Sequence, residues 1–527
     1  MSNFLLINPP IYDFAAYDLW AKPLGLLYIS AILKQYGHKS ILLDCMDRNH
    51  PLMPKTESKE YGCGPYYNTV VEKPEILAKI PRKYKRYGLP NESITKILNE
   101  IDRPDYILVS SGMTYWYLGV FEVIRTAKEK FKDTPIILGG NYASLCFDHA
   151  KEHSGADFVV ENGMSGLYSS LLKLGLKIRG LKEPFNNYPA PDYEGYKKNE
   201  YIAIRTSLGC PFNCGYCAIK TLAGKRWQTK SAETVINEIV YFAGQGIENI
   251  AFYDDALLYD AKNHIIPILK GLIERKLKVN LVRDLPLSPR CQPRCLAGEA
   301  GRWAGNGLFA PLEILAGLDI KLSPCLNRRF SQQFLTGRAN KDGGITPPSK
   351  SMIPICRQGS AAFSNGVNFH TPNGLHAKYI TKEVACLLKE AGFIMPRLSL
   401  ETVDPKAQKA SGGKVSTKEY LFAVENLVDS GYSRGEYCAY TMIGMPGQSL
   451  EEVDKTLDIA HNSGAHISLG EYSPIPQTKD WEKVKNNLPY LDPLWQNNSI
   501  FPFHPLSYWP KLQALKDKAH RLNNELR

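Results

Sequence analysis

Long hydrophobic runs are absent from this sequence of 527 residues. No stretch of about 18 or more apolar residues occurs, so no transmembrane helix is expected. The start, MSNFLLINPP, lacks a basic segment and a small-residue cleavage site, and we interpret it as a buried strand rather than a secretion signal. The sequence therefore predicts a cytoplasmic protein, in which thiols stay reduced.

A strong, evenly spread basic charge is also lacking. The formal net charge is +11, but residues 281–368 alone hold eleven Lys and Arg against five Asp and Glu. The remaining excess is diffuse, which is typical of a solvated surface rather than of a groove for nucleic acid. Nucleic acid is therefore not an expected partner.

The cysteines do not follow the pattern of a zinc site. Cys210, Cys214 and Cys217 lie in the stretch SLGCPFNCGYCAIK with C-x3-C-x2-C spacing, and no second pair follows nearby. Structural zinc sites use four ligands, usually in two pairs. Three thiolates on a four-iron cluster would instead leave one iron open for a substrate or cofactor. The absence of a fourth ligand is thus compatible with iron–sulfur chemistry.

What the sequence does contain is an alternation of strand and helix patterns. Within residues 1–180 the runs NFLLINPP, HKSILLDCMD, PDYILVSSGMTYW, TPIILGGNYAS and ADFVVENG predict strands, with helical patterns between them. This alternation predicts an α/β fold with a doubly wound, Rossmann-like parallel sheet, whose ligands lie beyond the carboxyl ends of the strands. Residues 51–90 are too long for a plain connection and predict a functional insert or lid.

A second series of strands and helices follows a linker at residues 181–200 that is rich in Pro, Asn and Tyr. Residues 201–480 predict a partial β/α (TIM-like) barrel, in which the active site lies at the carboxyl ends of the strands. Residues 481–527 predict a helical tail, which could cap the barrel or shape its pocket.

One segment, residues 281–368, breaks this alternation. It holds ten Gly, eight Pro and four Cys, and the dipeptide Val-Asn occurs at both 279–280 and 367–368. Joining Asn280 to Phe369 would give KLKVNFHTPNG, which has the pattern of a strand and a loop. We interpret the segment as foreign sequence within a barrel strand, from a mobile element or a gene-model error. A genuine surface domain is the alternative. Cys291 and Cys295 are then incidental rather than a second metal site.

The stretch CPFNCGYC resembles the cysteine motif of the radical S-adenosylmethionine (SAM) enzymes. The resemblance implies that Cys210, Cys214 and Cys217 bind a [4Fe-4S] cluster and that SAM chelates its open iron. One electron from the cluster would cleave SAM and release a deoxyadenosyl radical. The resemblance also implies that Tyr216 lies near the adenine of SAM.

Three later segments, FYDDALL, RLSLETVDP and MIGMPGQSLEE, resemble SAM-binding segments of the same family and occur in the same order. They imply SAM contacts from Asp254, Asp255, Ser399, Glu401, Gly444 and Gly447. Each also has a purely structural interpretation. The aspartates could cap the following helix, Glu401 could form a salt bridge, and the glycines could simply make a turn.

Residues 1–180 resemble the cobalamin-binding domain that precedes the barrel in one large radical SAM subclass. The matching segments are NPP, KPLGLLYISAILKQYGH, LGGNYAS and GADFVVENG. They imply cobalamin contacts from Ser110, Met113, Tyr115, Gly139, Gly140, Asn141, Ser144 and Glu161. A D-x-H-x-x-G motif is absent, so no histidine is expected on the cobalt. The aromatic residues of segment 110–117 suit the lower face of cobalt and packing between domains equally well.

Together these resemblances imply a cobalamin-dependent radical SAM enzyme. It would C-methylate or cyclise an unactivated carbon of a small molecule, with electrons from a donor such as flavodoxin or ferredoxin. The substrate is left open. One alternative is a non-catalytic cobalamin-binding protein or a relative disabled by segment 281–368. Another is a methylthiotransferase, which would need a further cysteine triad, whereas Cys45, Cys63 and Cys146 are scattered.

Overall fold

The computed structural model describes residues 1–161, 163–224, 226–283, 366–410 and 412–527. The chain divides into two compact units, Met1–Lys276 with Gln358–Arg527, and Leu277–Arg357. Apart from the last turns of one helix, the elements below belong to the first unit. The interpretation of residues 281–368 as foreign sequence falls almost wholly outside the described residues and stays a prediction.

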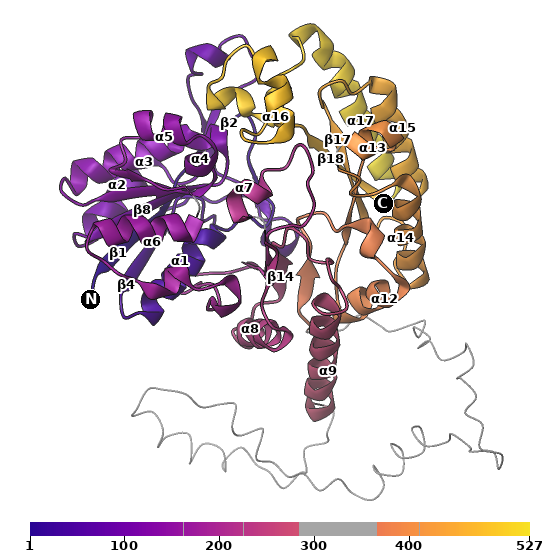
Figure 1. Ribbon diagram of the computed structural model, residues 1–527, viewed down its shortest axis with the longest axis horizontal. Coiled ribbons are helices and arrows are strands. Elements are labelled where there is room, and N and C mark those ends of the chain that lie inside the picture. Colours follow the sequence, from indigo (N-terminus) through magenta and orange to yellow (C-terminus); the bar gives the residue numbers. More distant parts are fainter. Residues whose placement is uncertain (162, 225, 284–365, 411) are drawn as a thin grey trace, which may run out of the picture. The chain divides into compact units, whose positions relative to one another are not determined.

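The first series of elements forms the predicted doubly wound sheet (Figure 1). Five parallel strands lie in the order β10-β9-β8-β1-β4. Their bounds are β1 Asn3–Asn8, β4 Lys39–Asp44, β8 Tyr106–Ser111, β9 Ile136–Gly139 and β10 Phe158–Val159. The strand order reverses between β1 and β8, so the carboxyl ends of these two strands mark the switch point at which such sheets bind ligands.

Alternate residues of β1 pack into different layers. Phe4 and Leu6 belong to one core cluster, whereas Leu5 and Ile7 belong to another. Side chains alternate across a strand, so the unbroken apolar run NFLLI fits a sheet that is covered on both faces. The first layer holds α1 (Leu24–Gln35) and α6 (Gly163–Lys173), and the second holds α2 (Asn91–Glu100) and α3 (Tyr117–Lys130).

Residues 51–90 form a small antiparallel structure on the edge of this domain. Strand β7 pairs with β2 on one side and β6 on the other, and β5 pairs with β3. Their bounds are β2 Ile11–Asp13, β3 Tyr17–Asp18, β5 Gly64–Pro65, β6 Asn68–Val70 and β7 Lys85–Tyr87. Arg86 of β7 forms a buried ion pair with Glu122 of α3, with Nε 2.9 Å from Oε2. This pair attaches the insert to the sheet.

The second series forms the predicted partial barrel from two groups of parallel strands, β11-β14-β15 and β16-β17-β18. Their bounds are β11 Ile202–Ile204, β14 Asn249–Phe252, β15 Asn368–His370, β16 Arg397–Glu401, β17 Cys438–Ile443 and β18 His466–Glu471. A bridge between Leu375 and Leu398 joins the two groups. The covering helices are α8 Ala232–Gly244, α9 Ile265–Arg283, α12 Lys382–Ala391, α14 Thr417–Asp429 and α15 Leu450–Asn462.

The outer face of the barrel strands is apolar. Ile202, Ile250 and Leu398 bury in one core with the covering helices. Because neighbouring residues of a strand point to opposite faces, Arg397 and Ser399 lie on the interior face of β16. The barrel interior is therefore the polar side of these strands.

Residues 276–280, which we predicted as the first half of a barrel strand, are helical. Helix α9 runs to Arg283, and β15 begins only at Asn368. The prediction was wrong because short apolar runs such as KLKV fit both periods, and here they continue the helix IIPILKGLIERK. In the described residues the chain is thus helical where the segment begins and forms a strand where it ends, and the interpretation of the segment as foreign sequence stays a prediction.

The segments expected as a linker and a tail pack against both series of elements. In the linker, the Tyr196 hydroxyl lies 2.6 Å from the Asp44 carboxylate at the end of β4. In the tail, the Asn523 amide of α17 (Trp509–Glu525) bonds to the backbone of Ile467 in β18. Asn497 donates to Asp13 at the end of β2, at 2.8 Å. The tail therefore caps the barrel and also covers part of the N-terminal domain.

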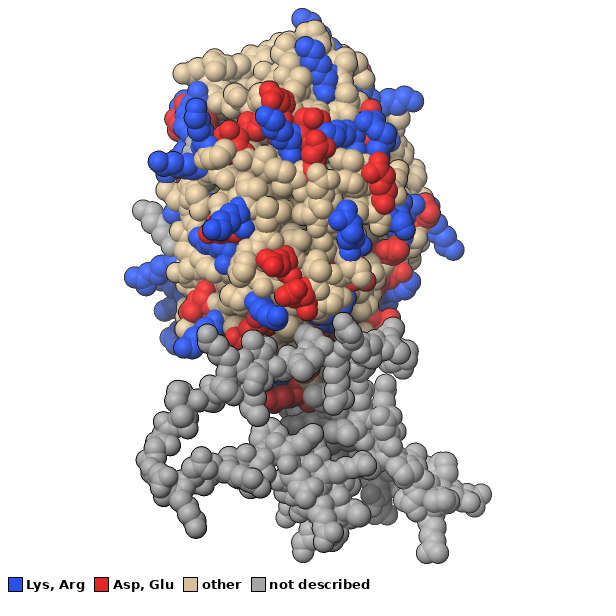
Figure 2. All heavy atoms as spheres, turned by 90° about the vertical axis from the view of Figure 1, so that its right-hand side faces the viewer, with Lys and Arg blue, Asp and Glu red and all other residues tan. Residues whose placement is uncertain are grey.

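The surface carries charges of both signs. Figure 2 shows basic and acidic side chains interspersed on the face that it presents. Lys518 of α17, for example, pairs with Asp454 and Asp458 of α15. None of the helices in the described ranges combines the length and the apolar character that a membrane span needs.

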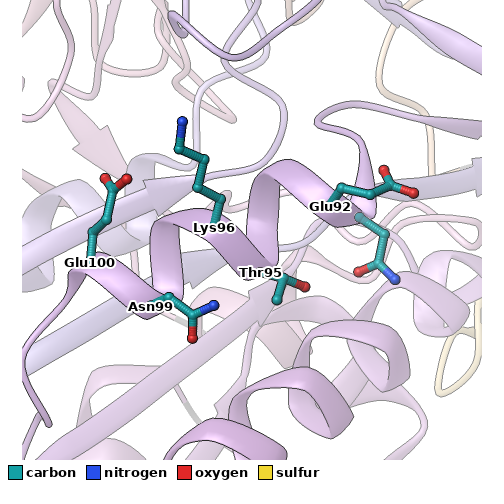
Figure 3. Close-up of a pocket in the computed structure, with 6 residues that line it drawn as sticks. Glu92, Thr95, Lys96, Asn99 and Glu100 are labelled. Carbon is teal, nitrogen blue, oxygen red and sulfur yellow. The ribbon is translucent and has the colours of Figure 1, made fainter.

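A shallow hollow lies along α2. Its lining residues all belong to that one helix, and they include Glu92, Thr95, Lys96 and Asn99. Figure 3 shows these side chains spread along the helix without converging on one point. The hollow therefore does not form a binding site.

Candidate functional site

The cysteine loop follows the first barrel strand, at the carboxyl end of β11. It starts where the short strand β12 (Ser207–Leu208) pairs with β13 (Gln228–Thr229). Gly209 has a φ of 87°, and a Cβ there would lie 2.8 Å from the Arg226 carbonyl oxygen. Only glycine fits this turn, which directs the chain into the cysteine loop.

The three thiols differ in exposure. Cys210 is buried, Cys214 is half-buried and Cys217 is exposed. Burial raises the pKa of each thiol, that of Cys210 to about 11, and the Lys414 ammonium acts in the opposite direction on all three. Across the described ranges, no group of three or more His, Cys, Asp or Glu side chains is gathered in metal-binding geometry. The donor set fits an iron–sulfur cluster by its chemistry, because bound iron would deprotonate the thiols that Lys414 already favours as thiolates.

A charged cluster lies next to this loop. Tyr216, between Cys214 and Cys217, donates a short hydrogen bond to Glu401 at the end of β16. Lys414 lies 2.9 Å from the same carboxylate oxygen, and both ends of this ion pair are largely buried. The predicted Tyr216 and Glu401 are therefore brought together. The salt-bridge interpretation of Glu401 is compatible with the geometry, and its role toward SAM stays a prediction.

Asp254 anchors the strand that leads to the cysteines. Its carboxylate is buried and accepts hydrogen bonds from the backbone N–H groups and the hydroxyls of Thr206 and Ser207. Asp255 accepts a longer bond, 3.4 Å, from the Gly209 N–H. With four donors already present, Asp254 is better suited to hold the loop than to bind SAM. These hydrogen bonds do not form the helix cap that we considered for the two aspartates.

Ser399 and the two glycines occupy different settings. The Ser399 side chain is 1% exposed, and its Oγ has no hydrogen-bond partner among the described residues. A Cβ at Gly444, after β17, would lie 2.9 Å from Cδ1 of Phe501 in the tail, whereas the space around Gly447 is open. Ser399 thus offers an unused polar group in the barrel interior, while Gly444 is closed off by the tail.

The site is completed by several residues that were not predicted from the sequence. Lys414 and Gly412 lie between α13 (Pro405–Ala410) and α14, and a Cβ at Gly412 would lie 3.1 Å from the Asn213 carbonyl oxygen in the cysteine loop. The Asp480 N–H donates to the Gly215 carbonyl oxygen at 2.9 Å. Asn373 donates to the Asp254 carbonyl oxygen. The glycine pair at 412–413 before a lysine was the one local signal for this packing.

The residues expected at cobalamin gather in part at one edge of the N-terminal sheet. Ser110 and Gly139 pair at the ends of β8 and β9. A Cβ at Gly140 would lie 2.6 Å from the Ser110 Oγ, and Asn141 donates to the Gly112 carbonyl oxygen at 2.6 Å. Next to them, the space around Gly139 is open. This opening at the carboxyl edge fits a ligand that approaches the backbone closely.

Other expected cobalamin residues have different surroundings. The Tyr115 hydroxyl bonds to Asn498 and that of Tyr117 bonds to Asp492, both in the tail. Ser144 is buried in α4, Glu161 is exposed after β10, and Met113 lies half-buried next to a short turn. The geometry at 115–117 therefore favours packing between segments over contact with cobalt.

The carboxyl edge of the N-terminal sheet lies next to the cysteine loop of the barrel. Helix α4 (Gly140–Leu145), which continues from β9, contacts α7 (Ile219–Ala223), which follows Cys217 directly (Figure 1). After β18, Gln477 donates to the carbonyl oxygens of Ser144 and Leu145. The carboxyl edge of the sheet and the cysteine loop of the barrel are thus neighbours.

The chain matches a protein-family model and, at low identity, individual related proteins. The radical SAM superfamily model matches residues 362–460, a range that does not include the three cysteines. An uncharacterized methyltransferase of Pyrococcus horikoshii is 26% identical over 203 residues, which are 33% of this chain and 44% of the relative. The hopanoid C-3 methylase of Methylococcus capsulatus is 23% identical over 211 residues, 34% of this chain and 41% of the relative. The matched segment thus spans less than half the length of either relative.

The fold is shared with a solved structure over most of the chain. The radical SAM methyltransferase TsrM from Kitasatospora setae, solved with cobalamin and a [4Fe-4S] cluster, has a TM-score of 0.56 at 14% identity. The similarity covers 92% of this chain and 78% of that one. Residues 362–460 thus match the radical SAM superfamily, and most of the chain shares its fold with a radical SAM methyltransferase of known structure.

Proposed function

We propose that this chain is a cobalamin-dependent radical SAM methyltransferase. The observation that carries the proposal is the contact of α4, which follows β9 at the sheet edge where we expect cobalamin, with α7, which follows the cysteine loop. A methyl carrier and a radical site must lie close to the same substrate carbon. In this proposal, residues 1–180 bind cobalamin and residues 201–480 bind the cluster and SAM.

Each group of residues has a proposed task. Cys210, Cys214 and Cys217 hold the cluster, while Tyr216, Ser399 and Glu401 orient SAM. When bound, these cofactors supply the radical and methyl-transfer chemistry, and the protein supplies position and excludes water. Asp254 holds the strand before the loop through its four hydrogen bonds.

The relatives bear on the reaction class. The hopanoid C-3 methylase and TsrM are named for methyl transfer. We therefore favour methylation over cyclisation. The methyl acceptor would be a small molecule, and a flavodoxin or ferredoxin would supply electrons.

The test is anaerobic reconstitution of the full chain with iron and sulfide, hydroxocobalamin, SAM and a reductant. We expect brown iron–sulfur absorbance, a shift of the cobalamin spectrum, and SAM turnover to 5′-deoxyadenosine or S-adenosylhomocysteine. Cys214→Ala should lose the iron–sulfur absorbance and SAM turnover, because two thiolates hold such a cluster poorly. Cys386→Ala, on α12, is the matched control and should retain both.

Two results would contradict the proposal. The enzyme assignment fails if an iron-replete sample turns over no SAM. The cobalamin assignment fails if the full chain retains no corrinoid after gel filtration while it still turns over SAM.

A further inference from the structure

A second cavity lies at the opposite end of the barrel interior from the cysteines. Its volume is about 740 Å³, and it is lined at the amino ends of strands by Arg397 of β16 and His466 of β18. The end of α17 contributes Asn523 and Arg527. Part of the remaining wall comes from the insert of the N-terminal domain, including Tyr61 and Cys63. Neither the cluster cysteines Cys210, Cys214 and Cys217 nor the expected cobalamin residues line this cavity.

One wall of the cavity is aromatic. The Trp20 and His370 rings are stacked with centroids 4.0 Å apart, and the Tyr61 ring lies 4.7 Å from that of His370. Arg48 holds the insert in place through bonds to the carbonyl oxygens of Glu57 and Gly62. The rings of this wall thus present flat surfaces, which suit an apolar or aromatic group of a ligand.

The backbone around this cavity is strained. Trp20, Tyr61 and Met395 all line it, and their φ values are 67°, 57° and 47°. Non-glycine residues seldom adopt this left-handed conformation, and such strain concentrates at ligand sites. Three strained residues from three separate segments on one cavity point to a binding function rather than to chance.

The cavity also holds an arginine that no carboxylate of the described residues pairs with, and the acidic side chain among its lining residues, Glu60, is exposed. Arg397 Nη1 lies 3.1 Å from the Tyr440 hydroxyl, and the guanidinium forms no ion pair among the described residues. Arg527 lines the same cavity, and Lys59 at the rim already pairs with Glu57. A partly buried arginine is suited to paired hydrogen bonds with a carboxylate or phosphate.

We propose that this cavity binds an organic anion. Its carboxylate or phosphate would pair with Arg397, and its apolar or aromatic body would pack on Trp20, Tyr61 and His370. The site is separate from the proposed SAM chemistry, and it can be tested in the absence of SAM and cobalamin.

Three related probes separate the contributions of charge and ring. Calorimetric titration of the full chain with 2-naphthoate, 2-naphthyl phosphate and neutral 2-naphthamide keeps the ring and changes the charge. We expect one of the two anions to bind at least about tenfold more tightly than the amide, because hydrogen bonds to charged groups are the stronger ones. The tighter anion identifies the natural head group as carboxylate or phosphate.

Variants then locate the binding. Arg397→Met should weaken binding of the preferred anion by about tenfold or more and leave naphthamide binding unchanged. The variant should keep the wild-type melting temperature, because no carboxylate loses its partner. Tyr61→Leu should weaken anion and amide alike. Arg103→Met removes an equivalent charge from the exposed segment before β8, outside the cavity. It should change the affinity for neither the anion nor the amide.

The proposal is overturned if the anions and the amide bind equally, or if none of the three binds. It is also overturned if Arg397→Met binds the anion as tightly as the wild type. If Arg397→Met fails to fold, Arg397→Lys replaces it, and wild-type affinities for both the anion and naphthamide in Tyr61→Leu would contradict the site.

Discussion

Glu401 combines a strained backbone with a charged cluster. Its φ is 65°, a conformation that costs on the order of 1–3 kcal/mol for a non-glycine residue. The register of β16 against β17 shifts between Ser399 and Glu401, at the point where the carboxylate meets Tyr216 and Lys414. Strain of this kind persists where surrounding contacts hold it, as in functional sites. The sequence motif predicted Glu401, whereas its strain and its ion partner follow from packing.

Buried histidines set a pH dependence of stability. Burial lowers the pKa of His370 to about 3 and that of His264 to about 4, whereas a histidine in the unfolded chain titrates near 6.5. The unfolded chain therefore takes up protons first as the pH falls. The stability contributed by neutral His370 is present above pH 6.5 and is lost on acidification, by about 2 kcal/mol at pH 5.

Thermal unfolding at pH 7 and pH 5 checks this prediction. The wild-type melting temperature should fall at pH 5, and His370→Asn should reduce that fall because its side chain does not titrate. His153→Asn, at an exposed position, should leave the fall unchanged. An equal fall in the wild type and in His370→Asn would exclude His370 as a cause.

At the scale of elements, regular strands and helices were predictable and short ones were not. The strand runs of both sheets were found from apolar runs, because burial on one or both faces imposes them. Strands β12 and β13 have two residues each, which is too short to show a hydrophobic alternation in the sequence. Helix α4 was not predicted, because GGNYAS follows a strand run and contains turn-forming residues, yet its contacts with β8 and α7 favour a helix.

The loop after β17 meets the tail, and this contact can be tested. Gly444→Ala and Gly447→Ala both place a side chain at a φ near 80°, at 82° and 77°. Each should cost about 1 kcal/mol for that conformation. Gly444→Ala should cost more, because its Cβ would lie 2.9 Å from Phe501, whereas nothing lies within 4 Å of a Cβ at Gly447.

Chemical denaturation of the two variants measures the difference between them. Phe501→Leu combined with Gly444→Ala should recover the steric part of the loss and leave the part due to φ. If Gly444→Ala and Gly447→Ala lose equal stability, the tail does not press on the loop in solution.

At the scale of the whole molecule, we predict that segment 281–368 can be removed without loss of SAM turnover. Val-Asn precedes both Leu281 and Phe369, so the deletion leaves Asn280 in the place of Asn368. Asn368 pairs with Asn249 in the β14–β15 register and bonds to its side chain at 3.2 Å. We expect the shortened chain to form the same β15 pairing and to turn over SAM at least as fast as the full chain.

The measurement is iron content and SAM turnover per chain for both forms after identical reconstitution. The shortened chain carrying Cys214→Ala should be inactive, which shows that any activity comes from the cysteine loop. The hypothesis of foreign sequence fails if the shortened chain binds less iron or turns over less SAM than the full chain.

The sequence by itself determined the order of the two α/β series and the position of the cysteine loop. Periodic burial and a short, local motif suffice for such features, because they depend on neighbouring residues. The tertiary structure alone decided which distant residues meet: Lys414 with Glu401, the tail with the N-terminal sheet, and Arg397 with Trp20 across a cavity. Lys414 and Glu401 are 13 residues apart, whereas the other contacts join segments far apart in the chain. No local pattern shows which of the many polar and aromatic residues will contact one another or line the same cavity.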